Sequence, residues 1–207
     1  MTEIFVIMGK SGAGKDTLVN RLMDEFGDKF SLTKLVPYTT RKMRENEADG
    51  REYHFVSNEE MNELKEKGLV IESRTYIKGN EGEVTYATVL PKRKEGKYVT
   101  INTPEGVLKI IDGLKQSRTI KIIPIYLNIA DRLLVQSVLD REHKQENPCI
   151  FEAYRRFMSD VKVDYNEKII NQIPNLITLR AENERERSRV LYKRLCRLIC
   201  TNNNKED

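Results

Sequence analysis

A glycine-rich stretch near the start of the chain has the residue types and spacing needed to hold phosphate groups. Residues 9–17 read Gly-Lys-Ser-Gly-Ala-Gly-Lys-Asp-Thr. Glycines allow successive backbone N–H groups to converge on phosphate oxygens, and a lysine at the position of Lys15 reaches the β- and γ-phosphates of a nucleotide. The stretch therefore predicts a P-loop that binds ATP. The residues expected to contact ATP there are Ser11, Gly12, Ala13, Gly14, Lys15, Asp16 and Thr17.

The residue after the lysine departs from the usual pattern. A P-loop normally has Ser or Thr there, with its hydroxyl on Mg²⁺, whereas this chain has Asp16 followed by Thr17. Thr17 can serve the phosphates from one position later, and charge repulsion keeps Asp16 from contacting an anion directly. The sequence therefore predicts a site for ATP and Mg²⁺ but leaves the metal ligands unknown.

The elements around this loop are those that a P-loop requires. An apolar run at 4–8 predicts a buried strand, and apolar residues at helical spacing over 18–26 predict a helix. Further strands are predicted at 31–36, 98–101, 120–127 and 176–179, and helices at 104–114, 130–142, 150–166 and 182–200. Strands that alternate with helices indicate an α/β fold with a parallel five-stranded sheet covered by helices. Short elements between 53 and 88 indicate an inserted subdomain.

Composition limits the class of protein. A chain of 207 residues with 39% hydrophobic and 33% charged residues fits one compact domain. A net charge of +4 is too small to argue for nucleic acid. Three cysteines favour a reducing compartment, and no apolar run approaches the about 18 residues of a membrane span. The first strand begins almost at once, which argues against a signal peptide, so the expected location is cytoplasmic.

A second motif follows the first helix. It reads Tyr38-Thr39-Thr40-Arg41, then Arg44 and Glu47, then Gly-Arg-Glu-Tyr-His-Phe-Val-Ser over 50–57. With the P-loop upstream, this segment closely resembles the nucleotide-binding subdomain of guanylate kinases. The resemblance covers most of the chain and is strongest over 3–90. It implies one guanylate-kinase-like domain over 1–207, with a core (1–36, 91–133 and 159–207), an NMP-binding subdomain (37–90) and a helical lid (134–158).

The resemblance implies which residues hold the phosphate of GMP, namely Arg41, Arg44, Tyr53 and Tyr86. The chemistry agrees, because guanidinium groups and phenolic hydroxyls can converge on a dianion. The alternative is a solvated basic loop.

Base recognition is predicted at Glu72, which stands where the family has its guanine-binding carboxylate, and at Thr88, where the family has a serine. An ionised carboxylate only accepts hydrogen bonds, and guanine presents N1–H and an exocyclic amine side by side. Two residues depart from the family pattern: Pro37 replaces a serine, and only Asn102 or Thr103 is available where an aspartate is expected. The alternative for Glu72 is an ordinary solvated carboxylate at a strand edge.

The resemblance also implies a lid. Arg141 and Arg156 stand near the arginines that bridge donor and acceptor phosphates, with Arg155 as a competitor for the second position. A further arginine expected one turn before Arg141 is replaced by Ser137. Asn171 resembles the asparagine near the donor adenine. The alternative is that these arginines are simply solvated.

The sequence therefore predicts an enzyme that transfers the γ-phosphoryl group of MgATP to GMP or dGMP, giving ADP and GDP. Its catalytic residues are expected to be Lys15, Arg41, Arg141 and Arg156. Its partners are expected to be these small molecules, with no nucleic acid or membrane, and the chain to be a monomer or homodimer. One alternative is a kinase for another nucleoside monophosphate, motivated by Pro37 and the missing aspartate. The other is a non-catalytic guanylate-kinase-like module that binds proteins, against which the complete P-loop argues.

Overall fold

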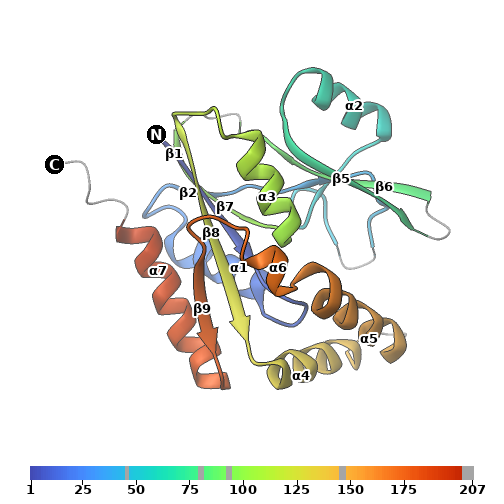
Figure 1. Ribbon diagram of the computed structural model, residues 1–207, viewed down its shortest axis with the longest axis vertical. Helices are drawn as coiled ribbons and strands as arrows, with labels where there is room; N and C mark the ends of the chain where they lie inside the picture. Colours follow the sequence, from blue (N-terminus) through green and yellow to red (C-terminus); the bar gives the residue numbers. More distant parts are fainter. Residues whose placement is uncertain (45–46, 79–81, 92–94, 145–147, 202–207) are drawn as a thin grey trace.

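The computed structural model describes residues 1–44, 47–78, 82–91, 95–144 and 148–201. Its centre is a five-stranded parallel sheet in the order β2-β7-β1-β8-β9. The strands are β1 (Thr2–Met8), β2 (Leu32–Lys34), β7 (Gly96–Ile101), β8 (Ile120–Ile129) and β9 (Ile177–Ala181). Helices cover the sheet (Figure 1). The predicted α/β class and parallel five-stranded sheet are confirmed.

The helices around this sheet are α1 (Lys15–Phe26), α3 (Pro104–Gly113), α4 (Asp131–Glu142), α5 (Ile150–Ser159), α6 (Glu167–Ile170) and α7 (Leu191–Thr201). Two π-helical turns, η2 (Asp160–Asp164) and η3 (Glu186–Val190), interrupt the stretches predicted as continuous helices over 150–166 and 182–200. Such turns occur often at functional sites because they redirect side chains. Within the described ranges, no helix is long and apolar enough to cross a membrane.

Strand β1 is buried along its whole length because the sheet is covered on both faces. Phe5 and Ile7 belong to a core cluster that includes residues of α1 and α7. Ile4 and Val6 belong to a second cluster that includes residues of α3. This two-sided burial explains why the strand is a continuous apolar run, and it fixes the end of β1 from which the P-loop emerges.

Pro124 is accommodated inside the sheet. Strand β8 lies between β1 and β9, but its registered pairing with β9 begins only at Ile125. Pro124 is paired with Val6 of β1 alone. The proline therefore stands at a local edge, where a missing backbone N–H is tolerated.

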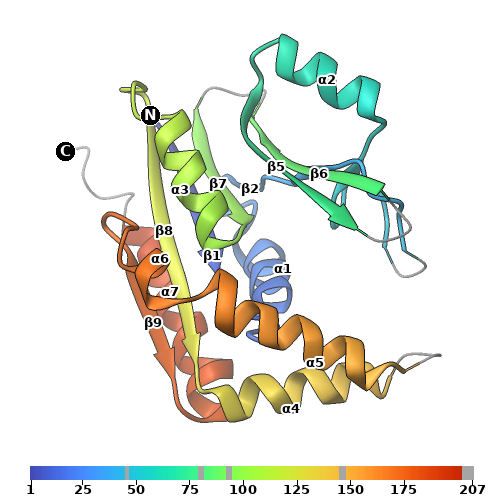
Figure 2. The same cartoon turned by 45° about the vertical axis from the view of Figure 1, so that its right-hand side comes forward.

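Residues 38–89 form a second, four-stranded sheet in the order β4-β3-β6-β5. Its elements are β3 (Tyr38–Thr39), β4 (His54–Phe55), α2 (Asn58–Glu66), β5 (Val70–Lys78) and β6 (Gly82–Val89). A capping box formed by Ser57 and Glu60 begins α2. Figure 2 shows the second sheet and the α4–α5 pair on the same side of the main sheet.

Candidate active site

The glycine-rich loop connects β1 to α1 and has the conformation that its glycines allow. Gly12 and Gly14 have φ angles of 84° and 76°, which residues with a Cβ atom rarely adopt. A Cβ atom on Gly12 would lie 2.6 Å from the carbonyl oxygen of Leu134, so the loop also packs tightly against α4. The predicted strand, glycine loop and helix are therefore present, and the loop's path depends on α4 as well as on its own sequence.

Lys15 begins α1 and folds back over the loop. Its Nζ donates hydrogen bonds to the carbonyl oxygens of Gly9 at 2.5 Å and Lys10 at 3.2 Å. Burial lowers the pKa of Lys15, and the nearby carboxylates of Asp16 and Asp160 oppose that shift. A partly buried ammonium with no fixed ion pair of its own among the described residues is suited to receive an anion.

Two side chains from η2 and its end contact the loop amides. The backbone N–H of Ser11 donates to a carboxylate oxygen of Asp160, and the N–H of Gly9 donates to the hydroxyl of Tyr165 at 3.1 Å. The carboxylate of Asp160 thus accepts from an amide that a phosphate oxygen would use. The sequence analysis missed both residues, because they lie about 150 residues from the loop and no local pattern connects them to it.

Arg41 and Glu47 form a buried ion pair on the opposite side. The guanidinium Nη1 and Nη2 atoms donate to the two carboxylate oxygens at 2.7 and 2.8 Å, and the arginine is only 5% exposed. Although burial opposes the charge, the hydrogen bonds that Arg41 donates to Glu47 raise the pKa of Arg41. The buried Nε atom has no hydrogen-bond partner among the described residues. For Arg41, the alternative of a solvated basic loop is wrong.

Tyrosine rings surround this arginine. The guanidinium lies 5.1 Å from the ring centre of Tyr53, and the rings of Tyr53 and Tyr86 meet edge to face at 5.6 Å. Burial raises the pKa of Tyr53, so its hydroxyl remains a donor at neutral pH. Arg44 is exposed, and its backbone N–H donates to Glu47 at 3.0 Å. These residues form a cationic, donor-rich wall.

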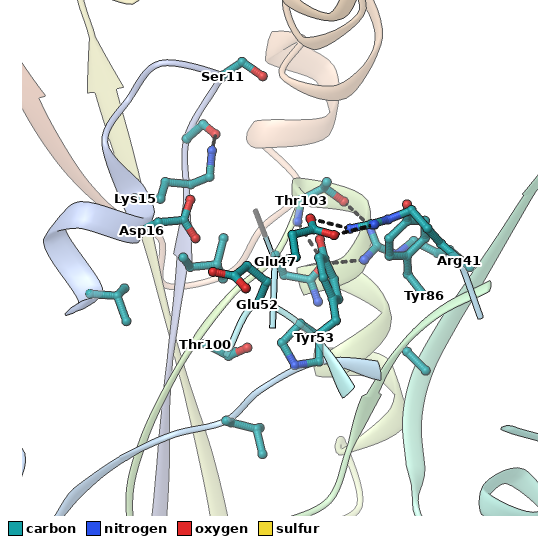
Figure 3. Close-up of a pocket in the computed structure, with 18 of the residues that line it drawn as sticks. Ser11, Lys15, Asp16, Arg41, Glu47, Glu52, Tyr53, Tyr86, Thr100 and Thr103 are labelled. Atoms are coloured by element: carbon teal, nitrogen blue, oxygen red, sulfur yellow. Dashed lines mark hydrogen bonds and ion pairs between the residues drawn. The ribbon is translucent and has the colours of Figure 1, made fainter. Parts of the chain in front are cut away.

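The P-loop with Lys15 and the wall formed by Arg41, Tyr53 and Tyr86 face one cleft of about 610 Å³, a volume typical of small-molecule sites. Figure 3 shows Lys15 and Asp16 on one side and Arg41, Tyr53 and Tyr86 on the other. The predicted site residues that line the cleft are Ser11, Lys15, Asp16, Arg41, Arg44, Tyr53, Glu72, Tyr86 and Arg141. The predicted residues Gly12, Ala13, Gly14, Thr17, Thr88 and Asn171 are not among its lining residues.

Glu72 lies in the wall of the same cleft as a buried carboxylate. Its side chain is 1% exposed, and it accepts hydrogen bonds from the Thr88 hydroxyl at 2.9 Å and from the Asn102 amide at 3.0 Å. The alternative of a solvated strand-edge carboxylate is therefore wrong. Its third partner, Arg74 Nε at 3.2 Å, was missed by the sequence analysis. A signal was available, because residues two apart on a strand share a face.

The lid positions are only partly described. Arg141 on α4 is exposed, lines the cleft and lies near enough to Lys15 to affect its pKa. The backbone of Arg156 belongs to α5, but its side chain lies outside the described part of the structure. Ser137, found where an arginine was expected, accepts a hydrogen bond from the guanidinium of Arg187, which sequence reasoning also missed.

Asn171 and Thr17 are not among the residues that line the cleft. Asn171 forms the C-cap of α6 and is exposed. Thr17 lies on an exposed position of the first turn of α1. Neither side chain is directed by a hydrogen bond toward the loop in the described structure, so their predicted contacts with ATP stay predictions.

A P-loop at the carboxyl end of the central strand of a parallel five-stranded sheet, facing arginines and tyrosines on a smaller sheet, defines the class of P-loop nucleotide kinases. The family model described as Guanylate kinase matches residues 1–172. The chain therefore belongs to the guanylate kinase family.

Individual relatives agree with this family. A guanylate kinase of Schizosaccharomyces pombe is 43% identical over 166 residues, which cover 79% of this chain and 76% of the relative. One from Desulfotalea psychrophila is 32% identical over 142 residues, 68% of each chain. The crystal structure of guanylate kinase from Anaplasma phagocytophilum has the same fold, with a TM-score of 0.60 and 18% identity over 99% of this chain and 88% of that one.

Proposed function

We infer that this protein is an ATP:GMP phosphotransferase that transfers the γ-phosphoryl group of ATP to GMP, giving ADP and GDP. The observation that carries the inference is the cleft in which the P-loop lysine faces a wall formed by Arg41, Tyr53 and Tyr86. Membership of the guanylate kinase family supports the same reaction. No feature of the described structure favours the non-catalytic alternative, and dGMP stays a proposed second acceptor.

We propose that the two walls of the cleft divide the nucleotides between them. The loop amides and Lys15 would hold the ATP phosphates, while Arg41, Arg44, Tyr53 and Tyr86 would hold the phosphate of GMP. The partnerless Nε donor of Arg41 supports an anion on that wall. An oxygen of the GMP phosphate then attacks the γ-phosphorus as ADP leaves, a reaction that depends on positioning and charge neutralisation more than on a general base.

Magnesium has oxygen ligands available in this cleft. The carboxylate of Asp16 and the hydroxyl of Thr100 both line it, and the Thr100 oxygen is buried without a hydrogen-bond partner among the described residues. Oxygen donors are what Mg²⁺ prefers, so we propose that these two residues contribute to its site. Bound Mg²⁺ would neutralise phosphate charge during transfer.

We propose that the lid, residues 134–158, closes over the bound nucleotides. Arg141 already lines the cleft, and we propose that it and Arg156 approach the transferring group. ATP would take the Ser11 amide from Asp160, so the turn η2 is expected to shift when ATP binds.

The three free cysteines favour the proposed cytoplasmic location.

The variant Lys15→Ala tests the proposed function. Transfer should be lost while the fold is retained, because the Lys15 charge acts on phosphates rather than on the core. ADP release in the presence of GMP measures transfer, and circular dichroism measures folding. Lys67→Ala is the matched control, because Lys67 is 61% exposed and caps the C-terminal end of α2, outside the cleft. Full turnover by a folded Lys15→Ala protein would contradict the P-loop role.

A further inference from the structure

Arg74 on β5 lies inside the base-recognition region beside Glu72. Its side chain is 9% exposed, and it lines the cleft. Its guanidinium donates to Glu72, to the amide oxygen of Asn102 at 2.5 Å and to the hydroxyl of Thr103. These bonds join β5 to the turn between β7 and α3. Arg74 is therefore a fixed part of the pocket wall.

Helix α3 leaves a space that fits this arrangement. A Cβ atom on Gly106 would lie 2.1 Å from the amide oxygen of Asn102 and 2.9 Å from the Cζ atom of Arg74. A side chain at Gly106 would therefore displace both groups. Thr103, which accepts from Arg74, also caps α3 by accepting from the N–H of Gly106 at 3.3 Å. The first turn of α3 thus fixes the position of the Arg74 guanidinium.

The bonds of Arg74 and Asn102 occupy most acceptor positions in this region. Glu72 Oε1 accepts from Thr88 and Asn102, and Oε2 accepts from Arg74. The amide oxygen of Asn102 accepts from Arg74 and from the N–H of Thr103 at 2.9 Å. Because each oxygen offers two lone pairs, Oε2 is the only side-chain oxygen of Glu72 and Asn102 that retains a position for a further donor, and Thr88, whose hydroxyl oxygen also retains one, does not line the cleft.

Guanine presents more hydrogen-bond donors than the oxygens of Glu72 and Asn102 can accept. Its N1–H and its 2-amino group lie side by side, and one position on Glu72 Oε2 satisfies only one of them. Hypoxanthine has the same N1–H and 6-oxo groups but no 2-amino group. The pocket therefore offers little to distinguish the two bases.

Arg74 is instead a donor to the 6-oxo group of the base, which accepts hydrogen bonds. A guanidinium has five N–H donors and no acceptor, and arginine commonly donates to O6 and N7 of guanine. Four of the N–H donors of Arg74 have partners in Glu72, Asn102 and Thr103, including Oε1 of Glu72 at 3.5 Å. The guanidinium also interacts with the hydroxyl of Tyr76, which lines the cleft, so a base that accepts from Arg74 would take the place of this hydroxyl. A 6-oxo group would accept from Arg74, whereas the 6-amino group of adenine would oppose it donor to donor.

We propose that Arg74 makes this pocket selective for 6-oxopurines without reading the 2-amino group, so that the enzyme phosphorylates IMP as well as GMP. The proposal rests on the proposed function, because both substrates react in the same way. An oxygen of the acceptor phosphate forms a bond to the γ-phosphorus of ATP, the bond from that phosphorus to the β–γ bridging oxygen breaks, and ADP leaves. IMP then yields IDP.

Steady-state kinetics with GMP, IMP and AMP test the proposal. For the unaltered protein, kcat/KM for IMP should lie within about tenfold of that for GMP, and AMP should be far poorer. Arg74→Ala releases acceptors on Glu72 and Asn102, which can then accept from the 2-amino group. The GMP/IMP ratio should therefore rise by about tenfold or more, the effect of one hydrogen bond to a charged acceptor. Arg118→Ala, which removes an exposed arginine outside the cleft, should leave the ratio unchanged.

Several outcomes would overturn the proposal. A GMP/IMP ratio well above tenfold in the unaltered protein would show that the 2-amino group is read, with the proposed function intact. An unchanged ratio in Arg74→Ala would show that Arg74 does not set it. If that variant fails to fold, Arg74→Gln and equilibrium binding of GMP and IMP to the unaltered protein give the same comparison. Failure of both GMP and IMP to react would instead refute the proposed function, and this proposal with it.

Discussion

The ion pair between Arg41 and Glu47 is expected to couple stability to GMP binding, and the variant Glu47→Gln tests that coupling. Glutamine keeps the volume of the side chain and one acceptor oxygen, but removes the negative charge and turns the second acceptor into a donor. Arg41 is then left buried with a donor facing its guanidinium. The variant should therefore weaken both the fold and the wall proposed to hold the GMP phosphate.

The expected size follows from burial. The two side chains are 3% and 15% exposed, and breaking a buried ion pair by removing one partner costs about 3–5 kcal/mol. The retained oxygen and the partial exposure of Glu47 reduce this to about 2–3 kcal/mol. Such a loss is a large share of the about 5–15 kcal/mol that stabilises a typical domain.

The pH dependence gives a second measure of the same contact. Hydrogen bonding to Arg41 lowers the pKa of Glu47 below its ordinary value. The stabilisation is therefore complete above the unfolded-state pKa of about 4.3 and is lost as pH falls through the lower folded-state pKa. The unaltered protein and Glu47→Gln should differ fully at neutral pH and converge in acid.

Urea unfolding at several pH values measures both effects, and steady-state kinetics should show a higher KM for GMP with little change for ATP. Glu63→Gln is the control, because the Glu63–Lys67 pair is exposed at the C-terminal end of α2 and contributes less than about 1 kcal/mol. If Glu47→Gln is no less stable than this control, the buried pair does not stabilise the fold. If the KM values for ATP and GMP rise together, the pair does not act on the acceptor side.

Two further predictions concern the P-loop. Gly12→Ala should destabilise the fold and weaken ATP binding, because it combines a positive φ with a clash against Leu134. The control Gly68→Ala, which has a positive φ but open space around it, should lower the free energy of unfolding in urea by only about 1–2 kcal/mol. Equal losses in the two variants would show that the clash at Gly12 is relieved. Asp160→Asn should bind ADP severalfold more tightly by isothermal titration calorimetry, because a carboxylate no longer competes with phosphate for a loop amide. Unchanged or weaker ADP binding would contradict that competition.

The sequence alone predicted the features that depend on local pattern. The apolar run of β1, the glycines after it and the spacing in α1 are contiguous, and together they indicated the P-loop and the α/β class. The caps of α2 and α3 were also predictable, because Ser57 and Thr103 act within one turn of their own helix. The motif containing Arg41 and Tyr53 indicated the guanylate kinase family, which the comparisons confirm.

Only the tertiary structure decided how these side chains are paired. The pairing of Asp160 and Tyr165 with the loop amides, and of Arg187 with Ser137, joins residues 50 to 156 positions apart. Hydrogen bonds of this kind depend on how the helices pack, and the spacing of residues within a short stretch of sequence does not predict that packing. For the same reason Glu72 could be interpreted from the sequence either as a solvated or as a base-binding carboxylate. The approach of β5 to β7 and α3 buries it, and that approach brings Arg74 into the base-recognition region.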